Sequence, residues 1–295
     1  MPESYFTEKF LEKDLKRVSH VEFDNPFWTG DGALYFTSGA KILRYNIHEK
    51  TWDVVIKLNG RINAVWLSPE GTLHAVAGTT LFRYRSGKWS KLKVRAPGAM
   101  DVLTAVFGFN DQQVYCADYS GNVHIINGHS VASTKLPSCD MLLSIHGNSP
   151  ENVWFGGRGV FRYDGKEFHK ELDERVSHIF CPSAELVYAA GYEKGAVATE
   201  PPCLYRRSKQ GVWEELSTSL FKGNDLQGIA LYQGHMYVSN YSGGIFEFDG
   251  KEFVQKGDNI LSIDLKETGP YLAAAAMGDA AFFDGKTWTF AQTGK

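Results

Sequence analysis

The stretch Asn152–Phe168, NVWFGGRGVFRYDGKEF, is the part of the sequence that decides the fold. It contains an apolar strand that ends in glycine, a second strand, and an Asp-Gly turn that is followed by an aromatic residue. Clear copies are HMYVSNYSGGIFEFDGKEF from His235 and YLAAAAMGDAAFFDGKTWTF from Tyr271. Weaker copies begin near Ala33, Thr72, Gln113 and Leu186. The chain is therefore built from repeats of roughly forty residues.

Repeats of this length, made of short strands, predict a β-propeller. One β-branched residue marks the inner strand of each repeat: Val21, Val65, Val106, Ile145, Ile179, Ile229 and Ile263. These anchors predict a single all-β propeller with seven blades of four antiparallel strands over residues 17–295. The residue three positions before each anchor is apolar and is expected to pack between blades: Val18, Ile62, Leu103, Leu142, Val176, Leu226 and Ile260.

The outer strands of the repeats share a turn. Asp164-Gly165, Asp249-Gly250 and Asp284-Gly285 predict two-residue hairpin turns in which glycine supplies the positive φ. The aromatic residues that follow the outer turns are expected to pack between blades: Trp52, Trp89, Phe168, Trp213, Phe253 and Trp288.

Residues 1–16 lie outside the seven repeats and form an N-terminal extension. Ser4 can cap a short helix that places Phe6 and Phe10 on one face, and we favour this interpretation. The alternative is an outer strand that latches the propeller.

Composition narrows the class of protein. The chain of 295 residues carries a formal net charge of −3, which argues against a general nucleic-acid binder. Its beginning has no apolar core of a signal peptide, and no apolar run is long enough to predict a membrane span. We therefore expect a cytoplasmic protein without a nucleic-acid or membrane partner. The four cysteines lack CxxC spacing, so we expect thiols, with no disulfide, metal or cofactor.

The pair Gly156-Gly157, followed by Tyr163 and Phe168, resembles the kelch repeat. Gly243-Gly244 with Phe248 and Phe253 gives a second version. The turn followed by an aromatic residue is equally similar to the propellers of bacterial sensor proteins, and the WD-repeat signature is absent. Because kelch-like and WD-like propellers mostly hold other proteins, the resemblance implies binding rather than catalysis.

The turns between second and third strands share one face of a propeller, where recognition is expected. Aligned positions on this rim carry Tyr119, Arg158, Tyr192 and Tyr241 in successive repeats. Tyrosine and arginine are enriched at protein-binding hot spots, so we predict a partner-binding arc here. An insertion that begins with Glu193 and Lys194 and ends in two prolines is expected to extend it. The alternatives are tyrosines packed sideways on the next blade and a tolerated surface loop.

Arginines occur four residues before three of the anchors, where the mouth of a central channel is expected. Arg17, Arg61 and Arg175 there predict a site for a carboxylate or phosphate. The alternative, which we favour, is that each arginine pairs with a nearby acidic residue.

A catalytic alternative rests on ionisable residues of the inner strands. His20 and His178 precede an anchor, while Glu22, His146 and Asp264 follow one. Lactonases of the gluconolactonase type hold a divalent metal near the propeller axis, so His20, Glu22, His178 and Asp264 are candidate catalytic residues by resemblance. The sequence departs from that family in lacking its opening motif and its Asn-Asp pair, and buried, hydrogen-bonded histidines are the alternative.

The sequence thus predicts a non-catalytic, monomeric propeller that binds another protein through its rim loops as a scaffold or an inhibitor. One specific version is an immunity-type protein that neutralises a toxic enzyme. The runner-up is the metal-dependent, lactonase-like enzyme.

Overall fold

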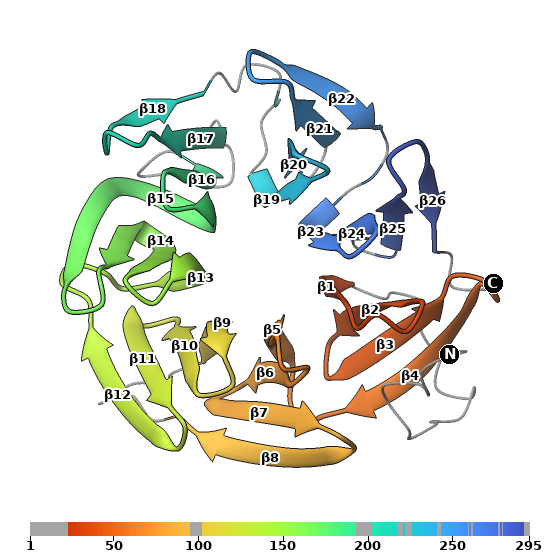
Figure 1. Cartoon of the computed structure of the whole chain (residues 1–295), viewed down its shortest axis with the longest axis horizontal. Helices are drawn as coiled ribbons and strands as arrows, with labels where there is room; N and C mark the ends of the chain where they lie inside the picture. Colours follow the sequence, from red (N-terminus) through yellow and green to blue (C-terminus); the bar gives the residue numbers. More distant parts are fainter. Residues whose placement is uncertain are drawn as a thin grey trace. The chain divides into compact units, whose positions relative to one another are not determined.

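The computed structural model describes residues 23–94, 102–192, 202–216, 221, 226–240, 243–258, 260, 262–276, 278 and 280–291. These residues form 26 β-strands and no helix. The strands build an all-β propeller fold of antiparallel blades, in six hydrogen-bonded sheets (Figure 1). Five sheets have four strands each and one has six. The extension predicted for residues 1–16 lies outside the described residues.

The chain divides into two compact units, and unit 1 comprises Met1–Ile62, Ser86–Lys88 and Gln227–Lys295. Its strands form three sheets: β1 (Asp24–Trp28), β2 (Ala33–Ser38), β3 (Lys41–Asn46) and β4 (Thr51–Lys57); β19 (Leu226–Tyr232), β20 (His235–Asn240), β21 (Gly244–Phe248) and β22 (Phe253–Gly257); β23 (Ser262–Thr268), β24 (Tyr271–Ala276), β25 (Ala280–Phe283) and β26 (Trp288–Phe290).

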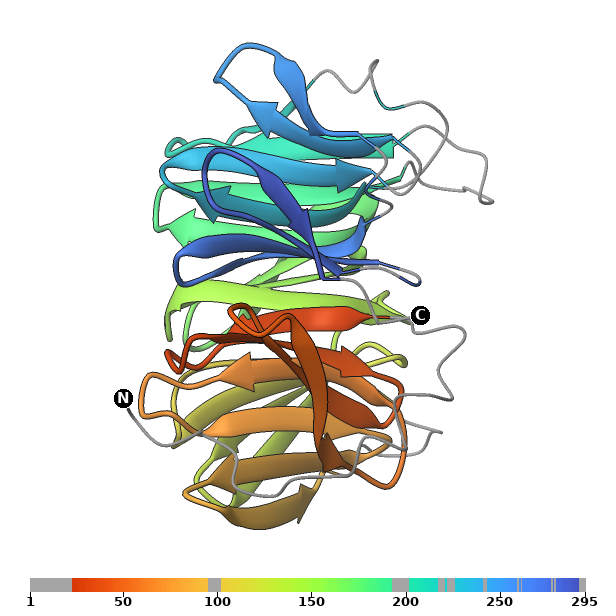
Figure 2. The ribbon, with the colours of Figure 1, turned by 90° about the vertical axis from the view of Figure 1, so that its right-hand side faces the viewer.

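Unit 2 comprises Asn63–Arg85 and Trp89–Leu226. Its strands form the other three sheets: β5 (Ile62–Leu67), β6 (Leu73–Ala77), β7 (Thr80–Arg85) and β8 (Lys88–Lys93); β9 (Leu103–Asn110), β10 (Gln113–Asp118), β11 (Asn122–Asn127) and β12 (Ser130–Lys135); β13 (Leu142–Ser149), β14 (Asn152–Tyr163), β15 (Phe168–Ser183), β16 (Leu186–Tyr192), β17 (Pro202–Arg207) and β18 (Trp213–Glu215). Figure 2 shows the strands of each sheet lying side by side in a second view.

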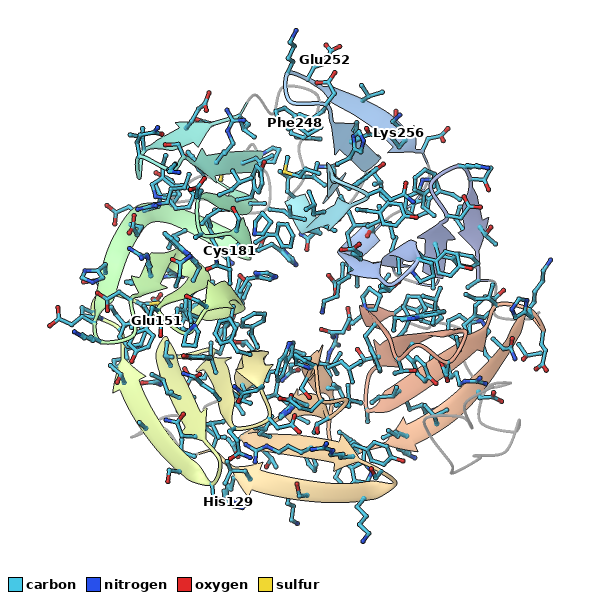
Figure 3. All side chains as sticks on the ribbon, in the orientation of Figure 1. His129, Glu151, Cys181, Phe248, Glu252 and Lys256 are labelled. Atoms are coloured by element: carbon cyan, nitrogen blue, oxygen red, sulfur yellow. The ribbon has the colours of Figure 1, made fainter. Side chains whose placement is uncertain are left out.

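The apolar row that starts the inner strands is buried, as predicted. Its described members are all nearly inaccessible to solvent: Ile62, Leu103, Leu142, Val176, Leu226 and Ile260. The cores lie between sheets. One cluster joins Leu34 and Tyr45 of the first sheet to Phe282 of the last, and another joins Tyr115 to Phe155 within unit 2. Cys181 and Phe248 are likewise buried, whereas Glu252 and Lys256 lie at the periphery of their sheet (Figure 3).

Four-stranded antiparallel blades are confirmed in five of the six sheets, but the expectation of seven blades is wrong, because the fourth and fifth repeats share one sheet. Strand β14 pairs with β13 through residues 152–157 and with β15 through residues 158–163. Strand β15 pairs with β14 through residues 168–175 and with β16 through residues 175–183. The two halves of β14 lie beside each other, since Arg162 Nε donates to Asn152 Oδ1 at 2.8 Å. Strand β15 runs without a break from the fourth repeat into the fifth, so the anchors Ile145 and Ile179 belong to the same six-stranded sheet. Counted by sheets, the described strands form six blades.

Glycine gives the expected conformation in the outer hairpins, but the turns are shifted by one residue. Gly165 has a φ of 94°, and Asp164 N donates to Glu167 O at 3.2 Å, so Gly165 and Lys166 are the central pair. The carboxylate of Asp164 accepts the amides of Lys166 and Glu167. Aspartate therefore closes the turn through its side chain, as is common in Asx turns.

Glycine is required on steric grounds in the pair Gly156-Gly157. A Cβ on Gly157 would lie 2.0 Å from the carbonyl oxygen of Met141, at the entry to β13, so no other residue fits without moving the backbone.

The outer aromatic residues differ in how far they are buried, since Trp52 and Phe253 are buried while Trp89 is exposed.

The four cysteines are buried and carry no disulfide. None of the described residues belongs to a helix that is long and apolar enough to cross a membrane.

Candidate functional site

Tyr119 is a strongly exposed aromatic residue at the end of a strand in unit 2. It follows β10, and 56% of the residue is accessible to solvent. Its backbone N–H donates to the carbonyl oxygen of Val102 at 3.0 Å, and Val102 is itself 43% exposed. Two apolar side chains thus lie on neighbouring backbone segments at the surface.

The turn that carries Tyr119 is fixed by the buried side chain of Asp118. Its Oδ1 accepts the amides of Ser120 at 2.9 Å and Asn122 at 2.8 Å. Its Oδ2 accepts Asn122 Nδ2 at 2.8 Å and lies 3.2 Å from His124 Nε2. Burial would raise the pKa of Asp118, but the hydrogen bonds from His124 and Asn122 outweigh burial and lower it. An ionised carboxylate therefore holds the turn.

His124 links this carboxylate to the outer strand. Its Nδ1 lies 2.8 Å from Ser133 Oγ, which completes a serine, histidine and aspartate series. Such a series can activate a nucleophile when it is accessible. Here the side chains of His124 and Asp118 are almost completely buried, and both oxygens of Asp118 are occupied by its own turn. The series supports the turn and does not form an open catalytic site.

Hydrogen bonds also connect this turn to the loop that enters β13. Lys135 Nζ donates to the carbonyl oxygens of both Ser120 and Cys139. The amide of Leu136 donates to Gly121 O at 3.1 Å. Tyr119 is therefore presented on backbone that is hydrogen-bonded on both sides.

Arg158 occupies the matching position one repeat later. Its N–H donates to Met141 O at 3.0 Å, just as Tyr119 N–H donates to Val102 O. The side chain is exposed and its Nη1 lies 2.8 Å from Asp140 Oδ2, which is also exposed. We call Val102, Tyr119, Asp140 and Arg158 the Tyr119 surface.

The structure brings together residues that the sequence assigned to different sites. Arg175, predicted at the channel mouth, is the backbone partner of both Arg158 across β14–β15 and Tyr192 across β15–β16.

The other predicted arginine of the channel mouth that the structure describes, Arg61, pairs with Asp24 at 3.2 Å and belongs to unit 1. The side chain of Tyr192 and all of Glu193, Lys194, Tyr241 and Arg17 lie outside the described residues.

The structure does not bring the inner-strand residues of the catalytic alternative together within one unit of the described chain. His20 and Glu22 lie outside the described residues, His178 lies on β15 of unit 2, and Asp264 lies on β23 of unit 1. His146 has a packing role, since its Nδ1 accepts the amide of Cys181 at 3.2 Å. In the part of the chain that the structure describes, no three His, Cys, Asp or Glu residues are placed to hold a metal ion.

Sequence reasoning did not find a row of aromatic rings next to His146. The ring of Phe107 stacks on His146 at 5.0 Å between centroids, and Phe180 contacts His146 in a T-shaped arrangement at 4.9 Å. Trp66 extends the row, 6.1 Å from Phe107. All follow an inner-strand anchor directly, so the repeat alignment contained this signal.

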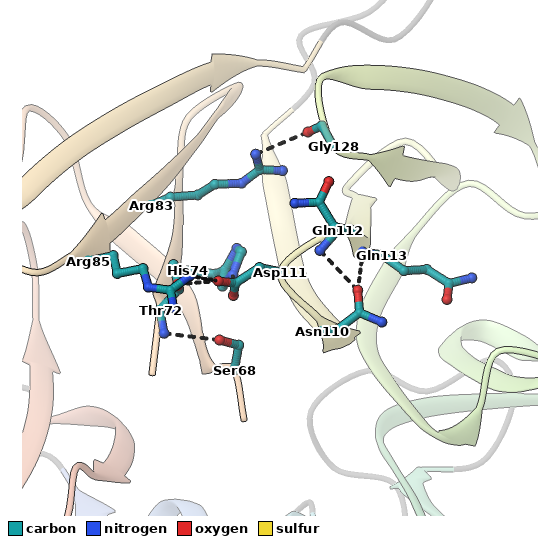
Figure 4. Close-up of polar contacts among 10 residues, drawn as sticks. All are labelled: Ser68, Thr72, His74, Arg83, Arg85, Asn110, Asp111, Gln112, Gln113 and Gly128. Atoms are coloured by element: carbon teal, nitrogen blue, oxygen red, sulfur yellow. Dashed lines mark hydrogen bonds and ion pairs between the residues drawn. The ribbon is translucent and has the colours of Figure 1, made fainter. Parts of the chain in front are cut away.

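A second histidine and aspartate pair joins two sheets of unit 2 (Figure 4). Asp111, between β9 and β10, accepts Thr72 Oγ1 at 2.6 Å and Arg85 Nη1 at 2.9 Å, and it lies 3.3 Å from His74 Nε2. Burial lowers the pKa of His74 to about 4, and the hydrogen bond to Asp111 only partly offsets this. Although the geometry is that of an ion pair, a neutral His74 that donates from Nε2 is the form consistent with its complete burial.

No protein-family model matches the sequence, and no curated protein sequence matches it. Solved structures do share the fold. The extracellular domain of the one-component system BT4673 from B. thetaiotaomicron has a TM-score of 0.71 at 12% identity, covering 98% of this chain. The chain spans only 43% of that protein's length.

Two other similar structures are a lyase and a set of WD40 repeats. A catalytically inactive virginiamycin B lyase from Staphylococcus aureus, bound to quinupristin, has a TM-score of 0.70 at 11% identity, covering 92% of this chain and 94% of that one. The RRP9 WD40 repeats have a TM-score of 0.68 at 12% identity, covering 88% of each chain. At such identities the likeness shows a β-propeller fold and no specific family, and the kelch resemblance is not confirmed.

Proposed function

We propose that the protein is a binding platform whose Tyr119 surface contacts another protein. The observation that carries the proposal is the exposure of Tyr119 on a turn that buried hydrogen bonds already hold in place. Ordering a free side chain or loop weakens binding, so a fixed aromatic residue is favoured as a hot spot.

The surface combines the chemical groups that protein interfaces use. Tyr119 and Val102 supply apolar area, and the exposed pair of Arg158 and Asp140 supplies charge at its edge. The backbone path from Arg158 through Arg175 to Tyr192 supports extending the contact to Tyr192, Glu193 and Lys194. Tyr241 belongs to unit 1 and stays a separate prediction of a partner-binding residue. The WD40 neighbours add support for a protein partner.

The test compares affinity capture by wild type and a Val102→Ser/Tyr119→Ala variant, with partners identified by mass spectrometry. Val212→Ser is the matched control, because Val212 is 63% exposed on the turn between β17 and β18. A partner retained by wild type and control but lost by the double variant would support the proposal. Equal capture by all three would remove it.

Once the partner has been identified, Tyr119→Ala should weaken binding to it by about 2 kcal/mol, or roughly thirtyfold in Kd. Thermal unfolding of the free variant should be unchanged, because the ring is mostly in solvent. The immunity-type version requires in addition that the partner be an enzyme that the protein inhibits, which a direct activity assay decides.

A further inference from the structure

Two turns of the chain share a sequence and a hydrogen bond. Asp118–Gly121 reads Asp-Tyr-Ser-Gly in unit 2, and Asn240–Gly243 reads Asn-Tyr-Ser-Gly in unit 1. Gly121 N donates to Asp118 O at 3.2 Å, and Gly243 N donates to Asn240 O at 3.3 Å. The first residue of each turn is completely buried. The two turns therefore share a sequence pattern, a buried first residue and one backbone hydrogen bond.

The two turns differ at two positions together. In β10–β11, Cys116 is the backbone partner of His124, and in β20–β21, Val238 is the partner of Phe246. Counting from these pairs, His124 and Phe246 occupy the same place relative to the first residue of their turn. A carboxylate occurs where histidine donates to it, and an amide occurs where phenylalanine cannot donate.

We propose that Asp118 and His124 act as one positioning unit for Tyr119, and that Asn240 and Phe246 are its uncharged counterpart. Asp118 holds the turn through the amides of Ser120 and Asn122, and His124 supplies one of the donors that keep the buried carboxylate ionised. The importance of the unit for recognition rests on the proposed function, but its geometry can be tested without a partner.

The reason is electrostatic. A buried carboxylate that loses a donor is left with an uncompensated charge, whereas a neutral amide that loses a donor costs less. The identity of residue 124 therefore decides whether aspartate or asparagine serves better at residue 118. Exchanging only one member of the unit should harm the turn, and exchanging both should restore it.

The experiment is a double-mutant cycle with Asp118→Asn, His124→Phe and the double variant. Amide hydrogen exchange at Ser120 and Asn122 is followed by NMR, with Val114 in the core of β10 as the internal reference. We expect His124→Phe to speed exchange at the turn by about tenfold or more. Asp118→Asn should speed exchange in the wild-type background and slow it in the His124→Phe background. A ¹⁹F label on Tyr119 should report the same pattern, which a uniform loss of stability would not produce.

Effects that simply add, or a change of the same sign in both backgrounds, would overturn the proposal. If His124→Phe does not fold, the reverse cycle decides. Asn240→Asp should speed exchange at the Gly243 amide, and Asn240→Asp/Phe246→His should slow it again. In one outcome, the cycle shows the expected coupling between Asp118 and His124 while Tyr119→Ala still captures the partner normally. That outcome would support the positioning unit and reject only the proposed function.

Discussion

The described part of unit 2 contains two buried histidines that each lie beside an aspartate, and the two pairs differ in what they join. Asp118 and His124 are six residues apart, and among the described residues the donors to Asp118 come from the turn and strand that follow it. Asp111 and His74 are 37 residues apart, and Asp111 receives Thr72, His74 and Arg85 from the neighbouring sheet. Asp118 and His124 stabilise one turn, whereas Asp111 and His74 connect two sheets. The same histidine and aspartate contact therefore stabilises a single turn in one place and the packing of two sheets in the other.

The largest expected effect is on the pair that ties the sheets. Asp111→Ala removes the acceptor of the buried donors Thr72 and His74 and should lower the free energy of unfolding by about 4 kcal/mol, since each buried donor is left unsatisfied. Urea unfolding measures this, with Asp173→Ala as the control because its pairing with Lys170 is exposed. If Asp111→Ala lowers the free energy of unfolding no more than the control does, Asp111 does not stabilise the contact between the two sheets.

Acidification should act on the same pair through His74. Its pKa is about 4 in the folded protein and 6.5 in the unfolded chain, so the unfolded chain binds more protons between these values. Stability from this group is complete above pH 6.5 and is lost as the pH falls towards 4, by about 3 kcal/mol. Unfolding of wild type and His74→Gln across this range isolates the effect. Parallel pH profiles would show that His74 is not the group responsible.

The local pair should give a smaller and confined effect. Asp118→Ala should cost about 2 kcal/mol and release the amides of Ser120 and Asn122, with little change in exchange at the sheet joined by Asp111. Hydrogen exchange resolved by residue distinguishes the two regions. Release of amides throughout unit 2 would mean that this pair, too, acts globally.

The smallest expected effect is at the exposed ion pair of the Tyr119 surface. Arg158→Ala and Asp140→Ala should each change stability by less than about 0.5 kcal/mol, because solvent screens the pair. Partner association should instead become less sensitive to salt, as measured by stopped-flow or surface-binding kinetics. A large loss of stability would show that the pair holds the β13 entry loop.

The fold was predictable from the sequence to the extent that it depends on local patterns. The repeat period, the buried row exemplified by Leu103 and Leu142, and the positive φ of Gly165 all follow from side-chain alternation and backbone sterics. The union of the fourth and fifth repeats could not be predicted, because Asp173–Val176 looks like a turn region between repeats but continues as strand β15.

The candidate site was only partly predictable. Rim alignment located Tyr119 and Arg158, but the support behind Tyr119 depends on which side chains meet across strands. The third strands carried a further signal that was missed, since arginine recurs at Arg44, Arg83, Arg162 and Arg206. Their partners are as different as Asp31, Asn152 and Glu214, so only the structure shows what each arginine contacts.

The six-stranded sheet limits how this chain can change length during evolution. Elsewhere one repeat corresponds to one sheet, so a duplication or deletion of about forty residues can add or remove a whole module. Strand β15 ends one repeat and begins the next without a break, and β14 spans two strand positions of its repeat. The fourth and fifth repeats can therefore be inherited, exchanged or lost only as a pair, and a graft between related proteins should place its junctions outside Leu142–Glu215.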